Sequence, residues 1–180
     1  MIFALSATSI RWMAANIKSR NLQSNSYKVI AFSKWNQDKR FCEANDWPKN
    51  RDEDELFRWW NRCVAMQQKD FIRLGIELNQ TLIGYVDLAE IKNNSAEIGI
   101  AIGDSKLWNV GIGTYAVRKL IDYAKNELGI TIFYGETHET NFRSGKMMEK
   151  LGFMEVSRMG SETYLGKEVG LVQYRLCLNE

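Results

Sequence analysis

The stretch from Ile98 to Leu128 constrains the fold more than any other part of the chain, because it reads as a strand, a loop and a long helix. Isoleucines at alternate positions, Ile98, Ile100 and Ile102, are typical of a strand. The loop ends in Gly111-Ile112-Gly113, and glycines let an anion approach the backbone closely. The first turn of a helix also leaves N–H groups unpaired at the positive end of the helix dipole. The stretch therefore predicts an anion-binding helix start.

One face of the predicted helix is apolar and the opposite face is polar. Such a separation is typical of a helix that packs one side against a core. Gly129 follows where glycine commonly ends a helix. The apolar positions are Val117, Leu120, Ile121, Ala124 and Leu128, and the polar ones are Arg118, Lys119, Asp122, Lys125 and Asn126.

The two glycines do not identify the anion by themselves, because many such pairs serve only a tight turn. No Gly-Lys-Ser/Thr follows them, which excludes the phosphate loop of nucleotide triphosphatases. Ala116 stands in place of the third glycine of a dinucleotide-binding motif, and no acidic residue ends a second short strand as a ribose ligand would. Both nucleotide motifs are therefore disfavoured.

Two separated segments carry a family resemblance. The first runs from Ala96 to Asp104 and continues in Trp108-Asn109-Val110-Gly111-Ile112-Gly113-Thr114, and the second runs from Asn141 to Phe153 and closes on Glu-Lys-Leu-Gly-Phe. Together they resemble the GNAT superfamily of acetyl-CoA-dependent N-acetyltransferases. The resemblance covers residues 70–178 well and the first seventy residues loosely. Trp108 favours the branch that contains the ribosomal-protein N-terminal acetyltransferases.

The resemblance implies acetyl-CoA as cosubstrate, bound largely by the backbone. Backbone groups of Ile100, Ala101 and Ile102 would pair with the pantetheine amides, and N–H groups from Val110 to Thr114 would hold the pyrophosphate. Val110 stands where relatives often have a basic residue, so one side-chain phosphate contact is expected to be missing. The expected cofactor set also includes Trp108, Asn109, Asn141 and Ser144.

The remaining pattern predicts a mixed sheet with helices on both faces. Three strands joined by short turns predict an antiparallel meander, and the helix after Gly111 should lead by a crossover to a parallel strand. The resemblance implies that this parallel pair splays apart around the pantetheine, in a single-domain GNAT-like α/β (α+β) fold. The predicted strands are residues 10–13, Phe71 to Leu78, Thr81 to Glu90, Ser95 to Ile102, Ile130 to Gly135, a strand that begins at Phe153, and Leu171 to Leu178. The other predicted segments are a first helix around residues 29–35, a helix from Asn141 to Leu151 and a polar hairpin loop from Gly160 to Gly170.

Length and composition favour one domain. With 180 residues, of which 45% are hydrophobic and 26% charged, the chain can build one well-buried core. We expect a single domain over residues 1–180, with acceptor-side helices in residues 1–69 and the sheet core in residues 70–180. The net charge of +2 argues against broad nucleic-acid binding. We expect a monomer or a homodimer.

The cysteines and the apolar segments bear on location. Cys42, Cys63 and Cys177 lie far apart and fit neither a disulfide framework nor a metal site, so no metal is expected and a reducing cytoplasm is favoured. No segment approaches the ~20 apolar residues that a membrane crossing requires. The sequence thus predicts a cytoplasmic protein that does not bind membranes.

Four consecutive acidic residues, Asp52 to Glu55, open a helix that carries Trp59 and Trp60. Acidic residues suit the positive end of a helix, which explains them without any ligand. GNAT enzymes usually build their acceptor sites from the first two helices, so the resemblance adds a second interpretation. In that interpretation the acids and both tryptophans line a pocket for a cationic amine. Apolar residues at helical spacing commonly face a core, so both interpretations stay open.

Two residues are candidates for the general base. Glu97 lies on the cofactor strand at the same distance before Gly111 as the base glutamate of histone-acetylating GNAT members, and alternation puts it on the side of the small residues Gly99 and Ala101. A solvated or ion-paired strand glutamate is the alternative. A histidine titrates near neutral pH, so His138, the one histidine of the chain, could accept a proton, although a solvated loop histidine also fits. Glu136 is another acid close to it.

Met148 departs from the family pattern. Many GNAT enzymes have there the tyrosine that protonates the leaving thiolate, whereas methionine has no proton to give. Tyr134, Tyr174 or water could substitute. The predicted function is acetyl transfer from acetyl-CoA to a primary amine of a small molecule, an amino sugar or a peptide N-terminus, by direct attack in a ternary complex. The alternative is a catalytically silent acyl-CoA-binding or partner-binding module.

Overall fold

A computed structural model of the chain describes residues 10–13, 33–47, 51–52, 54–59, 69–79 and 81–178. They fall into two compact units. The first contains the described residues up to Trp59, together with Arg73–Tyr85 and Ala101–Lys106. The second contains the described part of Gln68–Ile72, with Val86–Ile100 and Leu107–Glu180. The expectation of a single domain stays a prediction.

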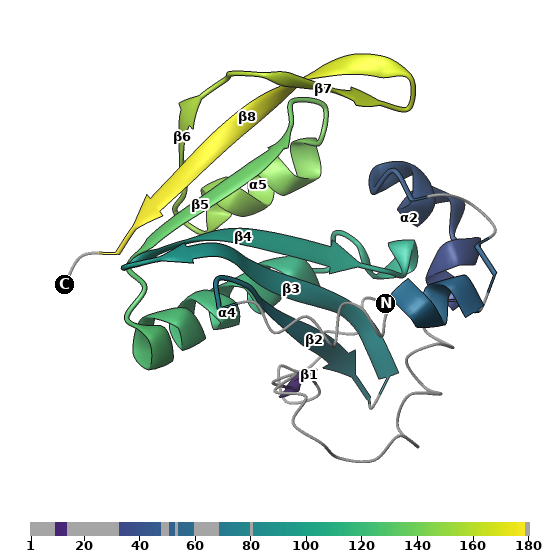
Figure 1. Ribbon diagram of the computed structural model, residues 1–180, viewed down its shortest axis with the longest axis horizontal. Coiled ribbons are helices and arrows are strands. Elements are labelled where there is room, and N and C mark those ends of the chain that lie inside the picture. Colours follow the sequence, from purple (N-terminus) through teal and green to yellow (C-terminus); the bar gives the residue numbers. More distant parts are fainter. Residues whose placement is uncertain are drawn as a thin grey trace. The chain divides into compact units, whose positions relative to one another are not determined.

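Within the described residues, eight strands and four named helical segments follow one another along the chain (Figure 1). Residues 33–37 and 54–59 are also helical. The named elements are β1 (Ile10–Met13), α2 (Lys39–Ala44), β2 (Ile72–Leu78), β3 (Thr81–Lys92), β4 (Ser95–Ile102), the 3₁₀ turn η3 (Ser105–Leu107), α4 (Ile112–Leu128), β5 (Ile132–His138), α5 (Phe142–Lys150), β6 (Met154–Ser157), β7 (Ser161–Tyr164) and β8 (Lys167–Cys177).

The strands are hydrogen-bonded in the order β1-β2-β3-β4-β5-β8-β6, and β7 pairs with β8. β4 and β5 are parallel, whereas β1 pairs antiparallel with β2, and β8 pairs antiparallel with β5, β6 and β7. The short turns after β2 and β3 force antiparallel neighbours there. The predicted fold class, a mixed and mostly antiparallel sheet with one parallel pair, is confirmed.

Helix α4 follows its predicted pattern. Val117, Leu120, Ile121 and Ala124 are buried, the predicted polar positions are exposed, and Gly129 ends the helix at φ 68°. Leu128 was placed on the apolar face, but it is 37% exposed. As the last residue of the helix it lies beside the turn at Gly129, where the buried face has ended.

The segment Gly160–Gly170 is not the loop that its polar composition predicts. It forms β7 and the first part of β8, and only Leu165 and Gly166 turn the chain, at φ 49° and 75°. Its strand residues are mostly exposed, so the alternation of apolar and polar residues that marks a half-buried strand is absent. A leucine at positive φ is also unusual, so the sequence does not mark Leu165 as a turn residue.

Aromatic packing organises the first unit. The rings of Trp35, Phe41, Trp47 and Trp59 form a chain of contacts with centroid separations of 5.8, 5.7 and 5.0 Å. An added Cβ on Gly103 would lie 2.0 Å from the Trp35 ring, so this close approach requires glycine. Trp35 and Phe41 are buried, and the cluster therefore provides much of the described core of this unit.

Asp38 joins helix α2 to the segment after β4. Its Oδ1 accepts from the N–H groups of Arg40 and Phe41 and so caps α2, and its Oδ2 accepts from the N–H of Ser105 at 2.8 Å. Partial burial alone would raise the pKa of Asp38, but the hydrogen bonds from Ser105, Phe41 and Arg40 together lower it. The charged carboxylate therefore stabilises the folded unit.

We predict that Asp38→Ala lowers the free energy of unfolding by about 1–2 kcal/mol, because a helix cap and a long-range bond are lost together. Because the folded-state pKa is lowered, this contribution is complete above the ordinary carboxyl pKa of 3.8 and disappears as the pH falls through the lowered value. Urea unfolding at pH 7 and at low pH measures both effects. The control is Asp104→Ala, which removes only an acceptor for the nearby Lys106 N–H. Equal losses for the two variants would contradict the long-range role.

Candidate functional site

The second unit contains a parallel pair of strands that separates part of the way along. β4 and β5 pair at Ser95–Ile132, Ala96–Phe133 and Glu97–Tyr134, and no later pair joins them, although the structure describes both strands to their ends. Figure 1 shows β4 and β5 diverging. The pairing therefore ends at Glu97, in agreement with the predicted splay.

Beyond Glu97, some backbone N–H and C=O groups of β4 face the side from which β5 has diverged. The carbonyl of Asn94 accepts from the N–H groups of Thr131 and Ile132. Alternate residues of a strand direct their backbone groups to the same neighbour, so Ile98 and Ile100 face the side of β5 after the pairing has stopped. An extended amide-bearing ligand could pair with them as a strand would. Ala101 and Ile102 continue β4 but belong to the first unit.

The N-terminus of α4 begins close to this part of β4. Gly111 is its N-cap at φ 90°, makes no side-chain capping bond, and has no atom within 4 Å of an added Cβ. The first helical bond runs from the Tyr115 N–H to the Gly111 carbonyl, so the N–H groups of Ile112, Gly113 and Thr114 have no acceptor within the helix. No acidic residue lies in this first turn. The helix start is therefore electropositive and suited to an anion.

Two contacts bring the two sequence motifs together. An added Cβ on Gly113 would lie 3.5 Å from both Ile100 Cδ1 and Met147 Sδ, so α4 begins between β4 and α5. The Arg143 guanidinium lies over the Trp108 ring, 3.7 Å from its centroid. This cation–π contact joins the loop before α4 to the first turn of α5. Sequence reasoning missed Arg143, although its position two residues after Asn141 was a usable signal.

Asn141 and Ser144 form the start of α5. The Asn141 side chain accepts from the Ser144 N–H at 3.3 Å, which confirms that Asn141 is a helix N-cap. Their cofactor contacts stay predictions. Asn109 has φ 64° and Val110 is 55% exposed, so the loop before Gly111 lies at the surface.

Glu97 lies at the point of separation, on the face opposite the buried Ala96 and Ile98. Its side chain reaches solvent, yet nearby protein atoms displace part of its hydration. This desolvation raises its pKa, and the charges of Glu136 and Glu90 raise it further. A carboxylate with raised pKa is a better proton acceptor than an ordinary glutamate, so its chemistry suits a general base.

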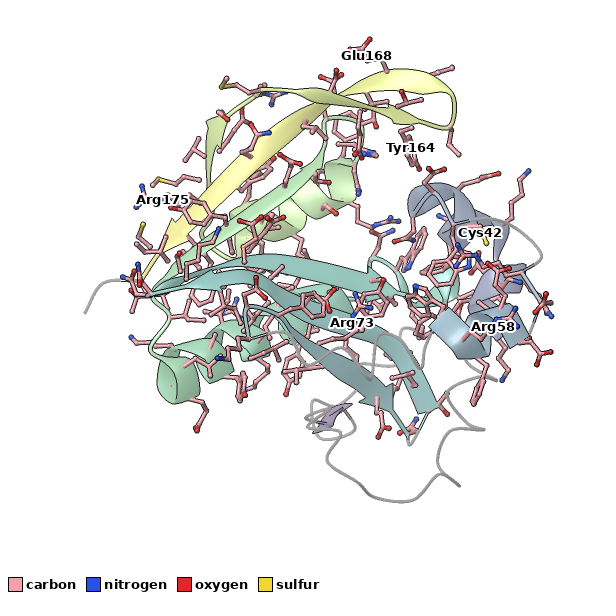
Figure 2. All side chains as sticks on the ribbon, viewed as in Figure 1. Cys42, Arg58, Arg73, Tyr164, Glu168 and Arg175 are labelled. Carbon is pink, nitrogen blue, oxygen red and sulfur yellow. The ribbon has the colours of Figure 1, made fainter. Side chains whose placement is uncertain are left out.

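His138 is not a solvated loop residue. It is the last residue of β5, its side chain is 17% exposed, and its Nε2 contacts Oε1 of Glu162 on β7. Its ring also packs edge-on against Tyr164 with centroids 4.5 Å apart. It lies four residues beyond Tyr134, the partner of Glu97, which is about 13 Å along a strand. Figure 2 shows Tyr164 toward the β7–β8 turn and Arg175 toward the other end of β8.

Met148 fills the position where the resemblance expects a tyrosine. It is 3% exposed, and an added Cβ on the facing Gly135 would lie 2.5 Å from its Cε. Tyr174 pairs with Gly135 in register, and its hydroxyl lies 3.0 Å from an added Cβ on Gly145, one turn before Met148. Burial and the charges of Glu155 and Glu149 raise the Tyr174 pKa, so its hydroxyl stays protonated. Tyr134 alternates with Gly135 and therefore faces the other side.

The acceptor candidates lie in the first unit. Asp52 accepts from the Glu55 N–H at 2.6 Å, which agrees with a helix-start role for Asp52, and Glu55 pairs with Arg51. Trp59 contacts the Trp47 ring and the Arg73 guanidinium, so core packing accounts for it. Its acceptor role stays a prediction. Trp60, Glu53 and Cys63 lie outside the described residues.

Among the residues that the structure describes, no group of His, Cys, Asp and Glu side chains could hold a metal ion. None of the described helices is long and apolar enough to cross a membrane.

Comparison with known proteins shows what this arrangement resembles. Residues 17–154 match the family model described as an acetyltransferase (GNAT) domain. An uncharacterized protein of Methanocaldococcus jannaschii is 32% identical over 120 residues, which is 66% of this chain and 24% of that protein, so the chain spans about a quarter of its curated relative.

Two solved structures have the same fold. One is spermidine N-acetyltransferase from Vibrio cholerae in complex with CoA and spermine, with a TM-score of 0.72 at 19% identity over 94% of this chain and 96% of that one. The other is the ribosomal α-N-protein acetyltransferase RimL in complex with CoA, with a TM-score of 0.77 at 16% identity over 96% of both chains. At these identities the likeness concerns the fold alone.

We predict that Gly111→Ala weakens acetyl-CoA binding roughly five-fold, because positive φ costs alanine about 1 kcal/mol and the loop relaxes away from its conformation. Calorimetric titration measures the affinity. The matched control is Gly166→Ala, since Gly166 has φ 75° and an added Cβ there also meets no atom within 4 Å. It carries the same strain in the β7–β8 turn. If both variants lose the same affinity, the special role of the α4 start is refuted.

Proposed function

This chain belongs to the GNAT family of acetyl-CoA-dependent N-acetyltransferases, and we propose that it transfers the acetyl group of acetyl-CoA to a primary amine by direct attack in a ternary complex. The observation that carries the proposal is the separation of β4 from β5 directly after Glu97. Together with the open first turn of α4, it puts amide-binding backbone, an anion-binding helix start and a carboxylate of raised pKa in one unit.

Acetyl-CoA is the cosubstrate, and this chain offers a group for each part of it. The N–H groups from Val110 to Thr114 bind the pyrophosphate, since they lie at the positive end of α4. Ile98 and Ile100 pair with the pantetheine amides, and the same strand polarises the thioester carbonyl. The Trp108–Arg143 pair lies between the two helix starts and orders the loop that supplies these donors.

Glu97 accepts the proton of the attacking amine, directly or through one water. The amine nitrogen forms a bond to the thioester carbon, the carbon–sulfur bond breaks, and CoA leaves as a thiolate that takes up a proton. The proton that the nitrogen loses moves to Glu97. Because a CoA thiol is a good leaving group near neutral pH, Met148 in place of a tyrosine is compatible with turnover.

No acyl-cysteine intermediate is required. Cys42 is buried in the first unit, and Cys177 is at the end of β8, outside both cofactor motifs. The free thiols of these two residues agree with a reducing cytoplasmic location.

The acceptor is a small amine, an amino sugar or a peptide α-amine. The two neighbours with solved structures are named for a polyamine and for a protein N-terminus, so a small amine and a peptide α-amine each have a structural precedent. The hypothesis of a polyamine acceptor is weakened, because two of the carboxylates proposed to bind it already have partners: Asp52 caps its helix and Glu55 pairs with Arg51. Trp59 and Trp60 remain the proposed acceptor-side residues.

The proposed function is tested by acetyl-CoA binding and by CoA release. We expect calorimetry to detect acetyl-CoA and CoA binding, and a thiol assay to detect CoA release with at least one of spermidine, glucosamine and a peptide with a free α-amine. Binding without turnover on any amine would favour the catalytically silent module. Absence of acetyl-CoA binding would refute both.

We predict that Glu97→Gln lowers kcat/KM by ~10²–10⁴-fold at neutral pH while acetyl-CoA affinity stays unchanged, because a positioned base typically contributes that much. The loss should shrink as the pH rises, since free amine becomes abundant and needs no base. A pH–rate profile of both forms measures this. Glu127→Gln, which removes an equal charge from the exposed face of α4, is the control and should match the wild type. Parallel curves for Glu97→Gln and the wild type would exclude Glu97 as the base.

A further inference from the structure

A second carboxylate lies beside Glu97 where the strands separate. Glu97 pairs in register with Tyr134, and Glu136 is two residues further along β5. Residues two apart on a strand share a face, so Glu136 is the next side chain on the face of Glu97. Glu136 therefore lies in the part of β5 that no longer pairs with β4.

Gln173 on β8 holds the Glu136 carboxylate. It pairs with Glu136 in register, and its Nε2 donates to Oε2 of Glu136 at 2.8 Å and to the Met159 carbonyl at 2.8 Å. Its Oε1 contacts the Ser157 hydroxyl and accepts from the Met159 N–H at 3.1 Å. These bonds determine the orientation of the amide, because a flipped amide would present an acceptor to both the Met159 carbonyl and Glu136.

The charges around Glu97 are mostly negative. β5 contributes Glu136, and β3 contributes Glu90 and the carboxylate of Asp87, which lies 3.4 Å from an added Cβ on Gly99 and is only 8% exposed. Lys92 pairs with Glu90 at 3.2 Å and so offsets part of its charge. Arg175 of β8 lies over the Tyr134 ring, 5.9 Å from its centroid. Burial is the largest cause of the raised pKa of Glu97, and the charge of Glu136 contributes more to it than that of Glu90.

We propose that Glu136 is a positioning residue for acetyl transfer: Gln173 fixes its carboxylate on the face that it shares with Glu97, and its charge favours movement of the acceptor's ammonium proton onto Glu97. The inference rests on the proposed function. The proton leaves the nitrogen for a Glu97 oxygen, and the nitrogen lone pair becomes free to attack the thioester. Glu136 itself touches no reacting atom, so it acts only through Glu97.

The first test needs no substrate. NMR titration of ¹³C-labelled glutamate carboxylates in the full chain, with the Glu97 signal assigned by its loss in Glu97→Gln, measures the Glu97 pKa directly. We expect Glu136→Gln to lower it, Glu136→Asp to restore most of the wild-type value, and Glu155→Gln to leave it unchanged. Glu155 is the matched control, since it removes an equal charge from β6 and pairs with Arg158 instead. An unchanged Glu97 pKa in Glu136→Gln would overturn the inference.

The second test is kinetic, with acetyl-CoA and whichever of spermidine, glucosamine and the peptide turns over fastest. We expect Glu136→Gln to move the acidic limb of the kcat/KM profile to lower pH and to reduce the plateau by roughly 2–10-fold, well below the loss for Glu97→Gln. A reduced rate with an unshifted limb would indicate a structural role and overturn the inference. A wild-type protein that binds acetyl-CoA but releases no CoA would overturn the proposed function as well, even if the Glu97 titration behaves as expected.

Discussion

The short parallel pairing of β4 with β5 is the constraint on which the second unit depends. Three paired residues join the strands, and the pairing stops at Glu97 and Tyr134. Continued pairing would consume the backbone groups of Ile98 and Ile100 in a ladder. Because the strands separate, those groups can serve a ligand, and Glu97 becomes the last side chain before the opening. One local break in a sheet thus produces both the proposed binding surface and the location of the proposed base.

The donor side of the site is made largely of backbone. The start of α4 supplies N–H groups, and Gly111 supplies the conformation that presents them. Backbone donors do not change when side chains do, so this arrangement requires neither a basic side chain at position 110 nor a phenolic one at position 148. The contacts of Gly113 with Ile100 and Met147 keep the helix start in place. The charged side chains lie instead on the face of β4 opposite Ala96 and Ile98, at Glu97 and its charged neighbours.

Local patterns predicted much of this fold, and failed where the pattern was absent. β4 matches its predicted bounds at Ser95–Ile102, and α4 ends at the predicted Gly129, because alternation, helical periodicity and glycine capping all act within a few residues. β7 was missed because Ser161–Tyr164 is polar and Leu165 turns at positive φ. β5 was predicted to end at Gly135, three residues before its end at His138, which left a solvated loop position open for His138. Its partners Glu162 and Tyr164 come from the strand that was missed.

The sequence by itself determined the strand–loop–helix unit from Ser95 to Gly129, the capped helix after Asn141 and the family to which both belong, because each depends on residues close together in the chain. Only the tertiary structure decided which distant groups meet. It placed Gln173 against Glu136, Arg143 over Trp108 and Glu162 against His138, pairs that are 37, 35 and 24 residues apart. Such contacts follow from strand order and register, and no local propensity encodes them. The raised pKa of Glu97 likewise depends on a neighbouring strand and could not be read from its own.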